Sequence, residues 1–233
     1  MLFDIIILMK TSSKKFRNRR LASLFVAGIL AILTIFSNQN FWQNPKNEVQ
    51  ISENFQQISQ DLESLEVKGR APKTGYSRKQ FGDGWAKDSS GCDTRNRILK
   101  RDLRETTENK KCQILTGILS DPYTGQEIKF SRAENSSAVQ IDHVVALSDT
   151  WQKGAQNLSF EQRVELANDP LNLLASEGNA NQQKGDSDAA SWLPPNKNFR
   201  CEYVSRQIRV KKKYSLWVTS AEKDAMKNVL AEC

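Results

Sequence analysis

The only histidine of this chain, His143, directly follows an aspartate, Asp142, inside the apolar run at residues 138–147. A carboxylate and an imidazole side by side among β-branched residues are costly to bury unless they have a task or satisfied partners. An imidazole exchanges its proton near neutral pH and is therefore suited to acid–base chemistry. Taken alone, such a pair favours a structural role. The surrounding sequence has to decide between that role and a catalytic one.

The sequence context is given by two segments that follow later in the chain. Asn172 lies in the segment PLNLL, and Asn181 and Lys184 lie in the segment NANQQKGD. Together with Asp142-His143, they resemble the motif of HNH (His-Me finger) nucleases, in which Asp-His ends one strand, Asn lies on the next strand, and Asn or His lies on a following helix. More specifically, the chain resembles an exported branch of this family, related to the C-terminal domain of GmrSD-type restriction enzymes. Further parts of the resemblance are Tyr76-Ser77-Arg78, Gly91-Cys92-Asp93-Thr94-Arg95-Asn96, Asp121-Pro122-Tyr123-Thr124-Gly125, Trp192-Leu193-Pro194-Pro195 and Cys233.

The resemblance implies a role for each residue of the motif. His143 would be the general base that deprotonates the attacking water. Asp142 and Asn181 would supply oxygen ligands to one divalent metal ion. Mg²⁺ is expected, because this hard cation prefers oxygen and keeps positions for water and phosphate. The metal would stabilise charge on the departing 3′ oxygen. Asn172 would brace the loop between the two strands and help to orient His143.

Two basic residues are candidate substrate contacts. Arg95, at the start of a predicted helix, could hold a phosphate with its guanidinium or form a surface ion pair. Lys184 could contact a backbone phosphate or lie on a solvated helix face, and we favour the phosphate. The resemblance also favours Asn181 over the neighbouring Asn179 as the metal ligand, because Lys184 follows Asn181 at the spacing of the family motif. The basic run at residues 206–213 could attract nucleic acid, but such runs are more often a solvated face.

The resemblance implies an α+β fold in which a ββα-metal (HNH) finger is embedded in a disulfide-stapled mixed domain. One geometrical condition follows. Adjacent residues of a regular strand point to opposite faces, so Asp142 and His143 can share a site only if the strand frays into a loop there.

Periodicity, turn residues and capping patterns predict the elements around the motif. Asp93 or Thr94 is the expected N-cap of a helix, and Ser159 with Gln162 forms a capping-box pattern. The expected helices are at residues 92–103, after 159, at 199–214 and after 219, and the expected strands are at 112–119, 126–130, 138–147 and 171–175. The residues Trp151, Trp192 and Trp217 are expected in the core rather than as base-stacking platforms.

The four cysteines agree with an oxidising compartment, where an even number of cysteines forms disulfides. Four cysteines allow three pairings. We favour Cys92–Cys112 and Cys201–Cys233, which keep each bridge within a local unit. A zinc site is the alternative, but the chain has no CxxC pair and its only histidine lies elsewhere.

The N-terminal segment carries the signature of export. A basic stretch at residues 14–20 precedes sixteen uncharged residues, 21–36. This pattern fits a signal peptide or an uncleaved membrane anchor, and either would export the rest of the chain. We expect residues 1–37 to be this leader, 38–70 a polar spacer that is partly helical, and 71–233 the nuclease domain. Six basic residues and one acidic residue fall in the leader, so most of the formal charge of +7 belongs to it.

The leading hypothesis is therefore an exported, metal-dependent endonuclease that hydrolyses phosphodiester bonds of DNA, with RNA as a possible substrate. Membrane contact is expected only through the N-terminal segment, and no protein partner is inferred. Two alternatives remain. One is a non-catalytic nucleic-acid-binding module on an HNH scaffold, and the other is a disulfide-stapled surface protein whose Asp-His pair is structural.

Overall fold

The computed structural model describes residues 45–233, with side chains from Phe55 onward. The chain divides into two compact units, Met1–Glu53 and Asn54–Cys233, and all candidate site residues lie in the second. The helices and strands described are α2 (Pro45–Ser64), α3 (Thr94–Asp102), β1 (Leu103–Glu108), β2 (Ile114–Ser120), β3 (Glu127–Ser131), β4 (Val139–His143), α4 (Leu147–Gln152), α5 (Phe160–Asn168), β5 (Leu173–Glu177), α6 (Gly178–Lys184), α7 (Arg200–Lys213) and α8 (Ser220–Leu230). The predicted mixed α+β class is confirmed.

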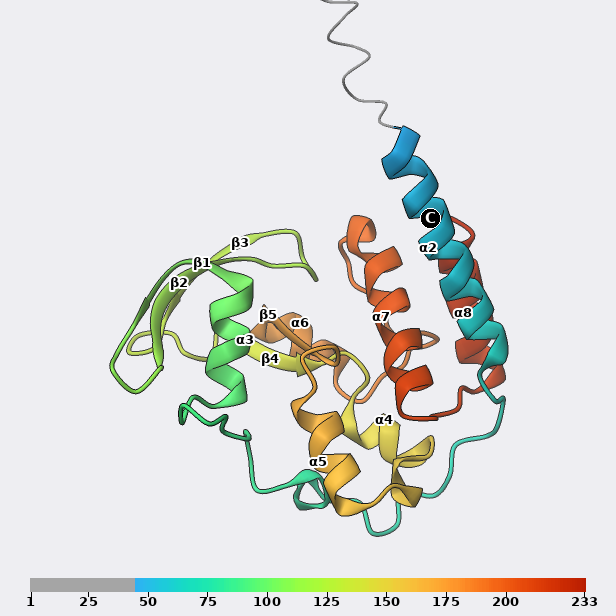
Figure 1. Ribbon diagram of the computed structural model, residues 1–233, viewed down its shortest axis with the longest axis horizontal. Coiled ribbons are helices and arrows are strands. Elements are labelled where there is room, and N and C mark those ends of the chain that lie inside the picture. Colours follow the sequence, from blue (N-terminus) through green and yellow to red (C-terminus); the bar gives the residue numbers. More distant parts are fainter. Residues whose placement is uncertain (1–44) are drawn as a thin grey trace, which may run out of the picture. The chain divides into compact units, whose positions relative to one another are not determined.

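The strands form two separate antiparallel sheets (Figure 1). β1, β2 and β3 make a three-stranded sheet in sequence order, and β4 pairs only with β5. In the second sheet Asp142 lies opposite Leu174 and His143 lies opposite Leu173. Helix α6 begins at the residue after β5 ends. The chain therefore runs from the strand with Asp-His to its partner strand and directly into a helix.

Helix α3 joins the two sheets. Its N-cap is Asp93, whose carboxylate accepts a hydrogen bond from the Asn96 amide, as the capping pattern predicted. Ile98 and Leu99 are buried in a core cluster that also contains residues of β2, β3, β4 and β5. Full burial of such a side chain contributes roughly 1.5–3 kcal/mol. This apolar cluster fixes the β4–β5 pair against the rest of the unit.

Helices α2, α7 and α8 share a second core cluster. The residues of α2 that enter it, Ile58 and Leu62, lie four apart and therefore on one face of the helix, and Leu65 follows the helix end. Within the expected spacer at residues 38–70, residues 45–64 are helical, as anticipated in part, but from Ile58 onward this helix packs into the folded unit. Its apolar residues are too sparse for the sequence to reveal that packing.

A third cluster lies between α4, α5 and α7 and includes Phe81, which lies in the segment before α3. The predicted capping box at the start of α5 is confirmed, because Ser159 and Gln162 exchange side-chain to backbone hydrogen bonds. Trp151 belongs to this cluster and Trp217 is also buried, while Trp192 packs partly buried against the second cluster. All three tryptophans therefore have the expected core positions.

One expected element differs from the structure, and one observed strand was not expected. The apolar run at residues 138–147 is not one strand, since β4 ends at His143 and α4 begins at Leu147. A fully buried run carries no periodicity that could have marked this break. Strand β1 was not predicted, because its sequence LRETTE is mostly charged or polar. It lies at the edge of the three-stranded sheet, where such residues are common.

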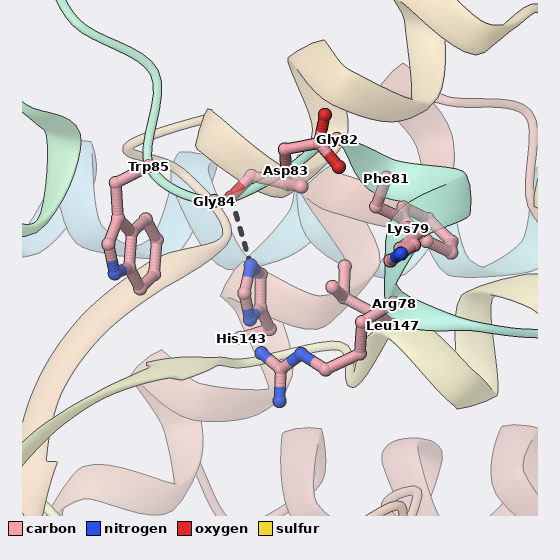
Figure 2. Close-up of a pocket in the computed structure, with 10 residues that line it drawn as sticks. Arg78, Lys79, Phe81, Gly82, Asp83, Gly84, Trp85, His143 and Leu147 are labelled. Carbon is pink, nitrogen blue, oxygen red and sulfur yellow. Dashed lines mark hydrogen bonds between the residues drawn. The ribbon is translucent and has the colours of Figure 1, made fainter.

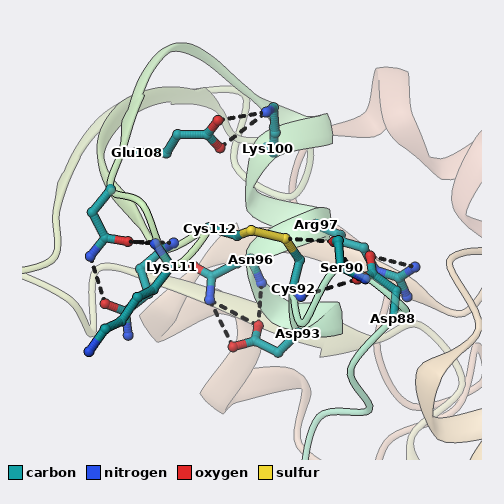
Figure 3. Close-up of a disulfide and its surroundings, with 12 residues drawn as sticks. Asp88, Ser90, Cys92, Asp93, Asn96, Arg97, Lys100, Glu108, Lys111 and Cys112 are labelled. Carbon is teal, nitrogen blue, oxygen red and sulfur yellow. Dashed lines mark hydrogen bonds and ion pairs between the residues drawn. A yellow bond between two sulfur atoms is a disulfide. The ribbon is translucent and has the colours of Figure 1, made fainter.

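The predicted disulfides are confirmed. Cys92 pairs with Cys112 and Cys201 pairs with Cys233, with Cα–Cα distances of 5.4 and 5.9 Å. Figure 3 shows the first bridge linking the start of α3 to the chain just before β2. All four cysteines are consumed, so the zinc alternative is excluded for them.

A network of buried charges connects the helical elements. Lys153 lies 2.7 Å from Asp149, 2.8 Å from Asp188 and 2.6 Å from Glu222. Lys211 lies 2.9 Å from the same glutamate. Arg70 approaches Asp188 at 2.7 Å from the edge of the cluster. The network members are Arg70, Asp149, Lys153, Asp188, Lys211 and Glu222. Three positive and three negative groups balance, so the interior carries no net charge there.

Among the helices of residues 45–233, none combines the length and apolar character needed to cross a bilayer. The leader predicted at residues 1–37 lies outside the described residues.

Candidate active site

His143 is the last residue of β4 and is buried, with 7% of its surface exposed. Its Nε2 lies 2.9 Å from the carbonyl oxygen of Ala167, at the end of α5. A carbonyl can only accept, so Nε2 carries the hydrogen and the neutral ring leaves Nδ1 with its lone pair free to act as a base. The indole of Trp85 is parallel to the imidazole, with 7° between the planes and 5.7 Å between the centroids (Figure 2).

The surroundings keep this ring neutral. Burial lowers the pKa of His143 from 6.5 to about 4, and the positive charges of Arg78 and Lys184 act in the same direction. The hydrogen bond to Ala167 opposes these effects without outweighing them. At neutral pH the imidazole is therefore unprotonated and able to take up a proton.

Asp142 is held through both carboxylate oxygens. Oδ2 accepts a hydrogen bond from the hydroxyl of Tyr123, and Oδ1 lies 3.0 Å from the ammonium of Lys184. Burial raises the pKa of Asp142, which the Lys184 ammonium and the Tyr123 hydroxyl partly offset. A carboxylate has about four acceptor positions, so each oxygen keeps capacity for another partner.

Lys184 lies at the end of α6, and its side chain is fully buried. Its Nζ also donates to the backbone carbonyl of His143 at 2.9 Å. Neither a phosphate contact nor a solvated helix face, the two alternatives from the sequence, matches this position. Lys184 instead ties α6 to the end of β4, and the expectation of a substrate contact is corrected to an internal one.

Asn172 immediately precedes β5 and is completely buried. Its Oδ1 accepts from the Val145 amide at 2.8 Å and its Nδ2 donates to the Val145 carbonyl at 3.3 Å. Its own carbonyl accepts from Val144 at 2.8 Å. The two residues that follow His143 are therefore pinned to the chain just before β5, which is the bracing contact that the resemblance implied.

A polar pocket of about 270 Å³ brings the motif together. Asp142 and His143 both line it, although neighbouring residues of a regular strand would face opposite ways. Both residues remain in the regular β4–β5 ladder, with His143 as its last pair, so the fraying into a loop that the sequence called for is not seen at Asp142. Asn181 lines the same pocket from α6, where its Nδ2 donates to Gln140 at 2.8 Å. The other polar residues of the lining are Tyr76, Arg78, Gln140, Gln182 and Asp186.

The remaining candidates lie apart from this pocket. Arg95 is partly buried and donates to the carbonyl of Val139 at 3.3 Å, so it contacts β4 rather than forming the surface ion pair considered as the alternative. Asn179 is exposed and does not line the pocket. The basic run at residues 206–213 is not a continuous solvated face, because Lys211 is fully buried in the charge network.

Sequence reasoning missed three residues around the site. Tyr123 was noted only as part of a segment that carries the resemblance, yet its hydroxyl donates to Asp142. Arg78 and Trp85 precede the motif by many residues, and the structure places both beside His143. The resemblance around Tyr76-Ser77-Arg78 was the only signal that this segment belongs with the site.

Comparison with known proteins gives two matches. Residues 93–229 match the family described as GmrSD restriction endonucleases, C-terminal domain, and this stretch is more than half of the chain. The chain belongs to this family. It is also 39% identical over 174 residues to an uncharacterized secreted protein of Arthroderma benhamiae, a match that covers 74% of this chain and 82% of the relative. No solved structure matches.

The family assignment indicates a nuclease-related function with nucleic acid as the substrate class. The match begins at Asp93 and contains Asp142, His143, Asn172 and Asn181. The predicted relation to the GmrSD C-terminal domain is thereby confirmed.

Proposed function

We propose that this protein is a metal-dependent endonuclease of the HNH type that hydrolyses phosphodiester bonds of DNA, with His143 as general base. The observation that carries the proposal is the pairing of two features in one pocket. His143 is neutral there and presents Nδ1 as the acceptor, and two oxygen-bearing side chains, Asp142 and Asn181, line the same space. The succession of β4, β5 and α6 supports a ββα-metal finger.

The residues of the pocket fit a divalent cation with hard, oxygen-preferring character. Asp142 offers a carboxylate, and the Asn181 side chain is engaged through its nitrogen, so its oxygen is the atom left for a metal. Residues 55–233 contain no cluster of three or more His, Cys, Asp or Glu residues able to hold a metal. Two protein ligands with water and substrate phosphate completing the shell is the usual arrangement for Mg²⁺. When bound, this ion would stabilise the charge on the departing oxygen.

The protein's own residues then divide the remaining work. His143 Nδ1 takes the proton of the attacking water, while the Ala167 carbonyl fixes the ring through Nε2. Asn172 and Lys184 act as positioning residues, because they hold the backbone at His143 and at the two residues that follow it. Arg95 contacts the backbone of β4 and does not line the polar pocket. Its role as a phosphate contact remains a prediction.

Export of the protein is part of the proposal. Both disulfides suit an oxidising compartment, and a relative that covers most of the chain is described as secreted. The basic and apolar pattern of residues 14–36 supplies the signal, either as a cleaved peptide or as an anchor.

Plasmid nicking by the purified full-length protein, with disulfides intact, tests the function. We expect nicking with Mg²⁺, none with EDTA, and a loss of roughly 10²–10⁴-fold in His143→Ala, the usual contribution of a general base. Circular dichroism and thermal unfolding verify that the variant is folded. A folded wild type that cuts neither DNA nor RNA with any divalent metal would overturn the proposal in favour of a nucleic-acid-binding module. A variant that merely unfolds would point to a structural Asp-His pair.

A further inference from the structure

A second pocket, of about 320 Å³, also borders His143 (Figure 2). Its volume falls in the range of roughly 300–1,000 Å³ that is typical of small-molecule sites. Trp85, Phe81, Leu147 and Ala167 give it apolar walls. Phe81 is buried and packs edge-on against Tyr76 and Trp151, so that wall is fixed by its neighbours. Such a lining favours a flat, apolar ligand group.

The polar groups of this pocket are gathered at the loop that carries Arg78. This residue lines both the second pocket and the polar pocket with Asp142 and Asn181. Arg78 is exposed, and within the part of the chain that the structure describes no carboxylate forms an ion pair with it. A guanidinium of this kind matches the geometry of a phosphate group. The two pockets are therefore connected through an available cation.

We propose that the second pocket binds the nucleobase of the nucleotide beside the scissile phosphate, and that Arg78 holds the phosphate between the two pockets. The inference rests on the proposed nuclease function and names the form of its substrate. Trp85 offers the aromatic face on which the base stacks, a contact that tolerates any base sequence. The base enters the apolar pocket while its phosphate lies toward the polar pocket beside His143.

This arrangement has a consequence for the substrate. A base can enter the pocket only when it is unstacked from a duplex, and unstacking is least costly in single strands, mismatches and damaged sites. The protein therefore acts preferentially on single-stranded or locally opened nucleic acid. We expect at least about tenfold faster cleavage of single-stranded DNA than of a perfect duplex of the same sequence.

A binding experiment tests the pocket independently of catalysis. Isothermal titration of the full-length protein with a deoxynucleoside 5′-monophosphate is compared with deoxyribose 5-phosphate, which lacks the base. We expect the nucleotide to bind tighter by roughly 5- to 150-fold, the usual effect of one stacked base. Equal affinities of the two ligands would overturn the proposal.

Two variants test whether the preference for the nucleotide over the sugar phosphate arises in the second pocket. Trp85→Ala removes the stacking face, and Ala167→Leu fills the pocket while keeping the backbone carbonyl that holds His143. Both should lose the preference for the nucleotide over the sugar phosphate. Phe160→Ala is the matched control, because Phe160 is an aromatic residue with 48% of its surface exposed that does not line the pocket. An unchanged preference in both folded pocket variants would contradict the assignment.

Arg78→Ala separates the phosphate contact from base binding. It should weaken both the nucleotide and the sugar phosphate by a similar factor, whereas Lys87→Ala, which removes another exposed cation outside this pocket, should weaken neither. Unaltered binding of both ligands in Arg78→Ala would remove Arg78 from the proposal. If the wild type binds the nucleotide selectively but cleaves nothing, the nuclease function fails while the nucleobase pocket stands.

Discussion

At the scale of single residues, the buried ammonium of Lys184 contacts the two residues that we propose carry the chemistry. It reaches the carboxylate of Asp142 and the carbonyl of His143 from the last turn of α6. A buried carboxylate without a partner is costly, and the ammonium of Lys184 opposes the rise that burial causes in the pKa of Asp142. The charge that the sequence suggested for the substrate is therefore used to hold the site in place.

Replacing Lys184 with Met should lower the free energy of unfolding by about 3–5 kcal/mol, the usual cost of removing one partner of a buried pair. Urea unfolding measures this change. In the double variant Asp142→Asn with Lys184→Met, no charge is left without a partner, so its cost should be smaller than the sum of the two single costs. Additive costs would mean that the two side chains do not interact in solution.

Asn181 and Asn179 provide a matched test of the metal ligand. Both are on α6, but only Asn181 lines the polar pocket, while Asn179 is exposed. We expect Asn181→Ala to require much more Mg²⁺ for half-maximal nicking and Asn179→Ala to behave as wild type. A titration of nicking rate against metal concentration measures both. The reverse order of effects would make Asn179 the ligand.

The site could be predicted from the sequence only as far as local spacing carries it. The order Asp142-His143, Asn172, Asn181 identified residues that the fold does bring to one region. The partners that set their chemistry, such as Tyr123 and Trp85, were not predictable. These contacts depend on tertiary packing between distant segments, and no sequence periodicity encodes them.

At the scale of elements, the bridge between Cys92 and Cys112 connects the start of α3 with the chain before β2 (Figure 3). Asn96 adds a polar link at the same joint, because its Oδ1 accepts hydrogen bonds from the Ile114 amide and from Arg132. Helix α3 in turn packs against β4 and β5 through Ile98 and Leu99. This joint therefore supports the sheet that ends in His143.

The double variant Cys92→Ser with Cys112→Ser should lose about 3 kcal/mol of stability, as expected for opening a loop of 20 residues. Thermal unfolding of the variant and of the wild type, both without reductant, measures the difference. The second disulfide remains as an internal control. A change below about 0.5 kcal/mol would show that α3 and the nearby polar contacts hold this joint without the bridge.

The elements themselves were largely predictable where a cap or a turn marks their ends. Asp93, Ser159 and Thr219 have the predicted capping contacts. Strand β1 was missed because its stability comes from pairing with β2, which lies beyond its own sequence. The packing of α2 was missed for a similar reason, since its few apolar residues among many polar ones give a weak helical pattern.

At the scale of the whole unit, the buried charge network sets the response to pH. Burial alone would raise the pKa of Asp188, but the Lys153 ammonium, the Ser191 hydroxyl and the Arg70 guanidinium together lower it below its ordinary value. The pKa of Lys211 behaves in the opposite sense. Burial alone would lower it, and Glu222 and Asp149 raise it above its ordinary value. Both shifts favour the ionised forms in the folded state.

These shifts predict a stability plateau. A carboxyl with a lowered folded-state pKa stabilises fully above its unfolded value of 3.8, and the contribution is lost as the pH falls further. A lysine with a raised pKa stabilises fully below 10.5, and the contribution is lost as the pH rises through the folded-state value. The contribution of the network to the urea midpoint should therefore fall below about pH 4 and above about pH 10.5. His143, whose pKa is lowered in the folded state, adds a separate loss of stability that begins as the pH falls below its ordinary value of 6.5. The Asp188→Asn variant should be less stable than the wild type at pH 7. Its urea midpoint should also depend less on pH on the acid side of the plateau. An unchanged acid slope would exclude Asp188 as its source.

The buried position of these charges also bears on ionic strength. Dissolved ions screen charges at a surface but hardly reach pairs such as Lys153 and Glu222, whose side chains are completely enclosed. Phosphate contacts at an open pocket weaken steeply as salt rises. At high salt the protein would therefore stay folded but release the nucleic acid proposed as its substrate. On dilution it would bind the substrate again without having to refold. If the protein is exported as proposed, a change in the salt concentration around it would reversibly switch substrate binding without unfolding the protein.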